Sequence, residues 1–192
     1  MANSCNTEYC FCGSKNSIEQ LRNVLEKSNK PFVYLGDVLK EFGLDEKRYY
    51  HRGDVVYCDH FCDGDDYYLK IITDTAWVGC HDMFFKIRNL IDEDMLMSYR
   101  EIECGCDIFN VYDEINYFSE ECCVDYDGEL FGECGLADLF DTKDSAIEFW
   151  CENVGYQWDK KTTSVEEMLK IIDKYQYEDD DTFFVIHEFT WL

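Results

Sequence analysis

Apolar residues follow strand and helix spacings along the first 126 residues and predict an ordered series of elements. Residues 9–12 are apolar and predict a short strand. Ser17 is expected to open a helix, because the apolar positions 18, 21, 24 and 25 fall on one helical face. After a break at residues 28–31, a shorter helix is predicted over residues 32–42. The chain therefore begins with a strand, a helix and an inserted helix.

The next segments predict a sheet. Residues 54–61 and 67–77 are rich in β-branched and aromatic side chains, which favour strands, and an acidic turn at 63–66 joins them. A helix over residues 80–91 and strands over 95–104, 107–112 and 117–126 follow. This order predicts an α+β protein with a ferredoxin-like antiparallel sheet that carries two helices on one face.

The pattern changes after Gly128. Residues 143–153 and 164–175 predict two helices, and residues 182–191 predict a last strand. We therefore expect two parts: a ferredoxin-like domain over residues 1–126, and an α/β extension over residues 127–192 that packs on the same core.

Composition and charge narrow the possible partners. The 192 residues are 46% hydrophobic and 17% aromatic, which is enough apolar area for a folded core. The 42 Asp and Glu against 17 Lys and Arg give a net charge of −25, which disfavours direct nucleic-acid binding and anionic membranes. Residues 1–6 lack the basic and apolar segments of a secretory signal, so the expected location is cytoplasmic. In that compartment the twelve cysteines are expected to be mostly free thiols.

One short motif suggests a metal. Cys58, His60 and Cys62 alternate along a predicted strand, so their side chains share a face and could bind zinc. The alternative is a hairpin arm that carries three such residues by chance, since zinc sites normally use wider spacings on turns. The cysteine pairs at 10 and 12, 104 and 106, and 122 and 123 could form a clustered site on one face of the sheet, but buried free thiols are the preferred interpretation. We expect no cofactor.

Other candidate sites give weaker signals. The acidic segments at 63–66 and 125–129 could bind calcium or magnesium, but solvated turns are the preferred interpretation. Cys80 and His81 lie at a predicted helix start, where the helix dipole could lower a thiol pKa, although a capping or core role is preferred. No nucleophile-elbow, metalloprotease, phosphate-loop or dinucleotide motif is present, and the sequence does not support enzyme activity.

Several short segments are similar to a known family. The start through Gly13, the run at residues 73–77 and the tripeptide at 99–101 resemble the YubB ferredoxin-like family, although Ser4 stands where that family usually carries Trp. The resemblance covers residues 1–126. It implies a ferredoxin-like fold and a setting on bacterial plasmids, phages and other mobile elements, without an agreed activity or catalytic residues.

Acidic runs at 92–94, 120–121 and 178–181 could imitate a phosphate backbone. The expected function is a non-enzymatic protein-binding module, with a basic or DNA-binding protein as partner and the chain itself a monomer or weak oligomer. Two other interpretations remain open. The acidity could serve only to keep the protein dissolved, or the protein could depend on a metal or on its thiols.

Overall fold

The computed structural model describes residues 3–26, 32–132 and 134–192. These residues form a mixed α+β structure with five α-helices and two sheets. The chain divides into two compact units: Met1–Phe118 together with Trp191–Leu192, and Ser119–Thr190. The predicted boundary at residue 126 falls inside a strand of the second unit, so the structure assigns residues 119–126 to that unit.

A seven-stranded sheet forms the base of the first unit. Its order is β10-β6-β5-β1-β4-β3-β2, and β1 pairs antiparallel with both β4 and β5. Tyr9 of β1 pairs with Ile71 of β4 and with Tyr99 of β5, which confirms that residues 9–12 and 67–72 belong to one antiparallel sheet. The strands are β1 (Ser4–Gly13), β2 (Val33–Tyr34), β3 (Gly53–Asp63), β4 (Asp66–Ala76), β5 (Leu96–Glu103), β6 (Ile108–Tyr112) and β10 (Thr190–Trp191).

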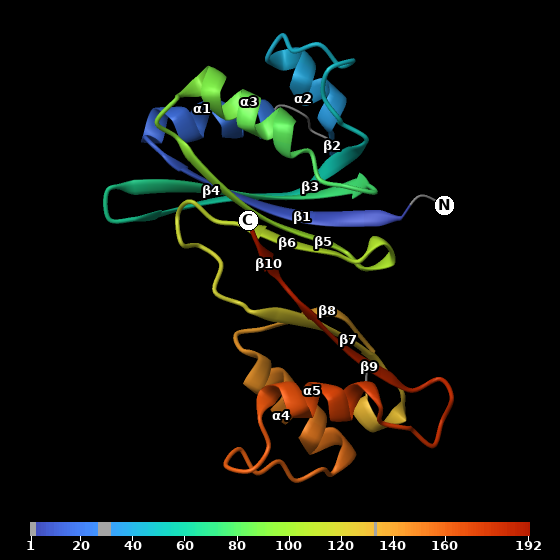
Figure 1. The fold of residues 1–192 in the computed structure, drawn as a ribbon. Helices are drawn as coiled ribbons and strands as arrows, with labels where there is room; N and C mark the ends of the chain where they lie inside the picture. The colour runs from blue at the N-terminus through green and yellow to red at the C-terminus, as the bar shows by residue number, and fades with distance from the viewer. Residues whose placement is uncertain (1–2, 27–31, 133) are drawn as a thin grey trace. The chain divides into compact units, whose positions relative to one another are not determined.

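Three helices cover one face of this sheet (Figure 1): α1 (Lys15–Glu26), α2 (Leu35–Glu41) and α3 (His81–Ile91). Leu21 of α1 and Phe84 of α3 are fully buried in one apolar cluster with Tyr9, so both predicted helix faces point to the sheet. The start of α1 differs from the prediction. Ser14 accepts a hydrogen bond from the Ser17 backbone N–H, and Ser17 itself lies within the helix.

The second predicted helix also begins later than expected. The helix expected over residues 32–42 begins only at Leu35, because Val33 and Tyr34 pair with β3. The predicted break at 28–31 lies outside the described residues.

The other face of the sheet carries a partly buried polar layer. Glu8 lies between Lys70 (2.8 Å from Nζ to Oε1) and Arg100 (3.3 Å from Nη2 to Oε2). Asp113 accepts hydrogen bonds from the Ser98 hydroxyl and from backbone N–H groups of the segment that follows it. These bonds fix residues 113–118 as a loop, and the strand predicted over 117–126 begins only at residue 122.

The second unit is a smaller sheet with two helices. Its strands β7 (Cys122–Asp127), β8 (Gly135–Phe140) and β9 (Phe183–Glu188) are arranged in the order β8-β7-β9. Helices α4 (Lys143–Val154) and α5 (Val165–Asp173) begin with capping boxes at Thr142 and Ser164. Their apolar faces pack on this sheet in a cluster centred on the fully buried Trp150.

Candidate functional site

The predicted metal residues lie on one strand, but among the described residues they are not placed as a group that could hold a metal ion. Cys58, His60 and Cys62 alternate along β3. Cys58 packs against the apolar core, and burial raises the pKa of its thiol to about 11. The Nε2 atom of His60 lies 3.1 Å from Nη1 of Arg22, whose positive charge disfavours a cation at that nitrogen. In the described part of the chain, no group of three or more His, Cys, Asp or Glu is placed to hold a metal ion.

The cysteines are dispersed, and the buried ones have raised pKa values. All twelve are free thiols. Cys5, Cys10 and Cys80 are buried, and burial raises the pKa of each thiol to about 12. The thiolate is the form that attacks electrophiles and binds metals. These three cysteines therefore behave as small apolar side chains near neutral pH.

Cys80 and His81 belong to a buried polar cluster at the start of α3. Cys80 occupies the position before the helix but makes no side-chain capping bond. Its backbone N–H donates instead to the hydroxyl of Tyr9, at 2.9 Å. The same hydroxyl lies 3.1 Å from Nδ1 of His81, whose ring stacks on Tyr99 with 3.8 Å between ring centroids. The predicted core role for this pair agrees with these contacts, while burial raises the thiol pKa where the helix-dipole argument predicts a lowered one.

Glu101 of β5 completes this cluster. Its Oε1 accepts a hydrogen bond from the Gly79 N–H at 2.6 Å, and its Oε2 accepts one from Asn110 at 3.3 Å. Oε2 also lies 3.2 Å from Nε2 of His81, an ion-pair distance at an angle that does not make a hydrogen bond. Burial alone would raise the pKa of Glu101, but the facing imidazole and the N–H donors outweigh it and lower the pKa to about 2.

This cluster has the side chains of acid–base chemistry in a setting that opposes proton transfer. A carboxylate, an imidazole and a phenol are common proton donors and acceptors in enzymes. Here Tyr9 is 0% exposed with a pKa well above its usual value, and Glu101 is 4% exposed with a pKa near 2. Neither group exchanges a proton near neutral pH. The hydrogen bonds of the cluster instead hold the loop before α3 against strands β1 and β5.

A second buried pair lies in the smaller sheet. Asp125 of β7 accepts a hydrogen bond from the Ala137 N–H at 2.6 Å, and its Oδ2 lies 3.1 Å from Nε2 of His187 on β9. The sequence placed Asp125 in a solvated acidic turn. That interpretation is wrong, because the carboxylate is buried and is used to join the three strands. The hairpin turn at 63–66 does form, with Gly64 at a φ of 61°.

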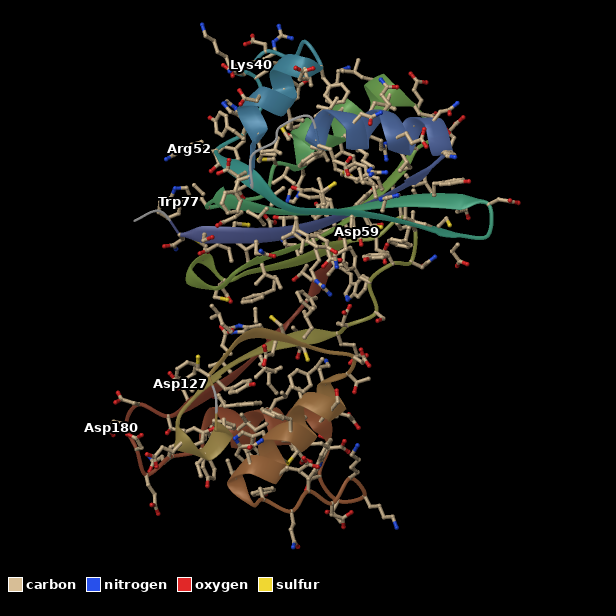
Figure 2. The ribbon with its side chains drawn as sticks, turned by 180° about the vertical axis from the view of Figure 1, so that it is seen from behind. Lys40, Arg52, Asp59, Trp77, Asp127 and Asp180 are labelled. Atoms are coloured by element: carbon tan, nitrogen blue, oxygen red, sulfur yellow. The ribbon has the colours of Figure 1, made fainter. Side chains whose placement is uncertain are left out.

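The exposed surface of the second unit is strongly acidic. Residues 119–190 contain no arginine, and their lysines are few: Lys143, Lys160, Lys161, Lys170 and Lys174. Residues 178–181 are all acidic and all exposed, and Figure 2 shows Asp180 at the tip of this loop. Asp127, at the end of β7, is exposed as well.

Sequence reasoning located the acidic loop but missed the two buried clusters. The signal for Glu101 was a carboxylate within a predicted strand, which is rarely buried unless the charge is paired. Tyr9 carried no signal of its own.

Within residues 3–26, 32–132 and 134–192, no helix combines the length and the apolar character needed to cross a bilayer. Comparisons of the chain with protein-family models, with curated proteins and with solved structures found no match, so the functional argument rests on the geometry and charge described above.

Proposed function

We propose that this protein is a non-enzymatic protein-binding module whose acidic surface binds a basic protein, and that it acts toward a DNA-binding protein as a mimic of DNA. The observation that carries the proposal is the charge of the second unit, which has no arginine and exposes consecutive carboxylates at residues 178–181. Such a surface attracts basic surfaces over several ångströms and accelerates their encounter.

Ion pairs within the second unit cannot neutralise this surface. Lys160 lies 2.7 Å from Asp144 and 2.8 Å from Glu148, and Lys143 lies 3.1 Å from Glu188. The carboxylates outnumber the lysines several-fold, so a large negative charge remains after every lysine is paired. A regular array of such charges is the feature through which a protein could compete with a phosphate backbone.

The first unit is proposed to have the ferredoxin-like arrangement. The support is the strand order β5-β1-β4-β3, which is antiparallel throughout and is the order that a β-α-β-β-α-β chain adopts in that fold. Helices α1 and α3 on one face agree with it. In this proposal β2, α2, β6 and β10 are additions. The cytoplasmic location and the mobile-element setting also stay proposals.

The test is a pull-down from bacterial lysate with the full chain as bait, at low and at moderate salt. A basic protein should be retained at low salt and lost steeply as salt shortens the screening length below ~10 Å. Recovery of no basic protein, or of one retained equally at high salt, contradicts the proposal. Duplex DNA should displace the recovered protein, and failure to do so would remove the mimicry while leaving acidic binding.

A matched pair of variants locates the binding surface. The first replaces the three aspartates at 179–181 with asparagine, which keeps their size and turn-forming hydrogen bonds. The control replaces Asp63, Asp65 and Asp66, the same number of charges in the exposed β3–β4 turn of the first unit. Both variants change the net charge equally, so only the first should lose the partner.

A further inference from the structure

We propose that the partner is bound through an extended basic segment that adds a strand to the free edge of β9. This inference rests on the proposed function, and it specifies the form and chemistry of the partner. In strand addition, backbone hydrogen bonds provide affinity, and alternate side chains enter pockets that provide specificity.

The edge is accompanied by a groove. β9 is an outer strand of the β8-β7-β9 sheet. Along it runs a groove of about 400 Å³, lined on one side by Leu169, Ile172 and Asp173 at the end of α5. The other side is formed by the consecutive residues 183–186 and by Glu188. Successive strand residues point to opposite faces, so a groove that meets all of them follows the strand edge and not one face of the sheet.

The register of β9 shows which backbone groups face this edge. Phe189, directly after β9, donates its N–H to the carbonyl of Glu121, directly before β7, so the Phe189 N–H points toward β7. Hydrogen-bonded pairs alternate with pairs whose N–H and C=O groups point away from the neighbouring strand. The outward groups therefore belong to Phe184, Ile186 and Glu188, three donors and three acceptors spaced for a partner strand.

Apolar side chains from both α5 and β9 line the groove. Leu169 and Ile172 come from α5, while Phe184 and Ile186 come from β9. Together they form an apolar wall beside the outward backbone groups, which suits alternate apolar side chains of an added strand. β9 has six residues, so a bound segment of about six residues fills it.

The carboxylates near the groove indicate which other side chains the bound segment of the partner should carry. Asp173 and Glu188 line the groove, although Glu188 already pairs with Lys143. A second pocket, of about 380 Å³, shares Tyr175 and Tyr177 with the groove and adds the carboxylates of Glu129, Glu178 and Asp179. The centroids of the two tyrosine rings are 4.9 Å apart, and the ring planes meet at 65°. Aromatic faces beside carboxylates bind guanidinium and ammonium groups, and arginine is the better fit.

The test uses a defined probe and the full chain. The probe is a fluorescent, end-blocked hexapeptide of alternating arginine and valine, and its binding is followed by anisotropy. A second hexapeptide carries N-methyl groups on alternate amides, which removes donors to the β9 edge without changing charge. We expect the methylated peptide to bind at least tenfold more weakly. Equal binding of the two peptides, or no binding of the first, overturns strand addition.

Two further measurements place the interaction on β9. Binding of the unmethylated peptide should slow amide hydrogen exchange at Phe184, Ile186 and Glu188, whereas simple acidic adhesion leaves these amides unchanged. Glu188→Pro removes one outward N–H, a change that edge strands tolerate, and should weaken binding about tenfold relative to Glu188→Ala, which loses the same carboxylate. Equal affinities of two folded variants contradict the proposal. A basic protein retained by the chain but indifferent to these changes would leave the proposed function standing and remove this inference alone.

Discussion

Replacing Glu101 with glutamine tests whether the buried cluster stabilises the fold through its charge. Glutamine has nearly the same shape, but its amide carries no negative charge to face the His81 ring nitrogen Nε2, which lies 3.2 Å from the carboxylate. It also directs an NH₂ group toward either Gly79 or Asn110, both of which donate to the carboxylate in the native protein. The substitution therefore removes charge-assisted contacts and creates a donor facing a donor.

The size of the effect follows from the pKa. The pKa of Glu101 falls from an ordinary 4.5 to about 2 in the folded protein, so folding favours the ionised form. A difference of this size corresponds to about 3 kcal/mol of stability at neutral pH, since one pKa unit is about 1.4 kcal/mol. This stability is fully present above the unfolded pKa and is lost as pH falls through the folded pKa. At pH 3 about 1 kcal/mol remains.

Urea unfolding of the wild type and of Glu101→Gln from pH 7 to pH 3 measures this dependence. Urea also limits precipitation near the isoelectric point of about 4.2. The wild type should be more stable by about 3 kcal/mol at pH 7, and the difference should shrink by more than half at pH 3. Glu103→Gln, a buried carboxylate two residues along the same strand, is the control for loss of a buried charge. A difference between wild type and Glu101→Gln that is constant with pH would refute the reasoning.

Other expected results concern thiols and packing. Because burial raises their pKa to about 12, the thiols of Cys5 and Cys80 should resist a thiol reagent at pH 8 in the folded protein. The exposed Cys62 should react. Mass spectrometry that finds Cys80 modified without urea would contradict this. Gly79→Ala should lower stability by about 1–3 kcal/mol, because the added Cβ would lie 2.5 Å from Cε1 of His81, and an unchanged urea midpoint would disprove that contact. Trp150→Phe should cost about 2 kcal/mol or more through lost volume and the lost bond to Tyr177, measured by thermal unfolding; full retention of stability would show that the site repacks without loss.

Much of the fold was predictable because its core residues keep a regular period. The helix over residues 80–91 was expected from Met83, Phe84 and Ile87, and all three are fully buried in α3. Strand β8 was missed. It contains Ala137 at a φ of 56°, and Leu136 and Leu139 are exposed, so the segment shows neither the alternation nor the β-branched content of an ordinary strand.

The candidate site was harder to predict from sequence, because it depends on pairing between distant segments. Asp125 looked like a turn residue beside other acidic residues, but in the structure it is buried between the Ala137 N–H and His187, which is 62 positions away. Cys58, His60 and Cys62 suggested a ligand set through local spacing, yet Arg22 on a different element lies 3.1 Å from the ring nitrogen Nε2 of His60. The groove along β9 likewise needs α5 beside it. Local patterns contain no information on such neighbours.

The pairing of β10 with the first unit's sheet has a consequence for chain entropy. Trp191 and Leu192 belong to the first unit although residues 119–190 separate them from its other members, and within the second unit Glu121 and Phe189 are hydrogen-bonded at 3.1 Å. While the second unit is folded, its two ends are held together, so the connection from β6 to β10 behaves as a short loop. If it unfolds, the same connection becomes a flexible loop of roughly seventy residues instead of about ten, and closing it costs about 2 kcal/mol more. A strand of two residues cannot offset that cost, so β10 should leave the sheet whenever the second unit unfolds.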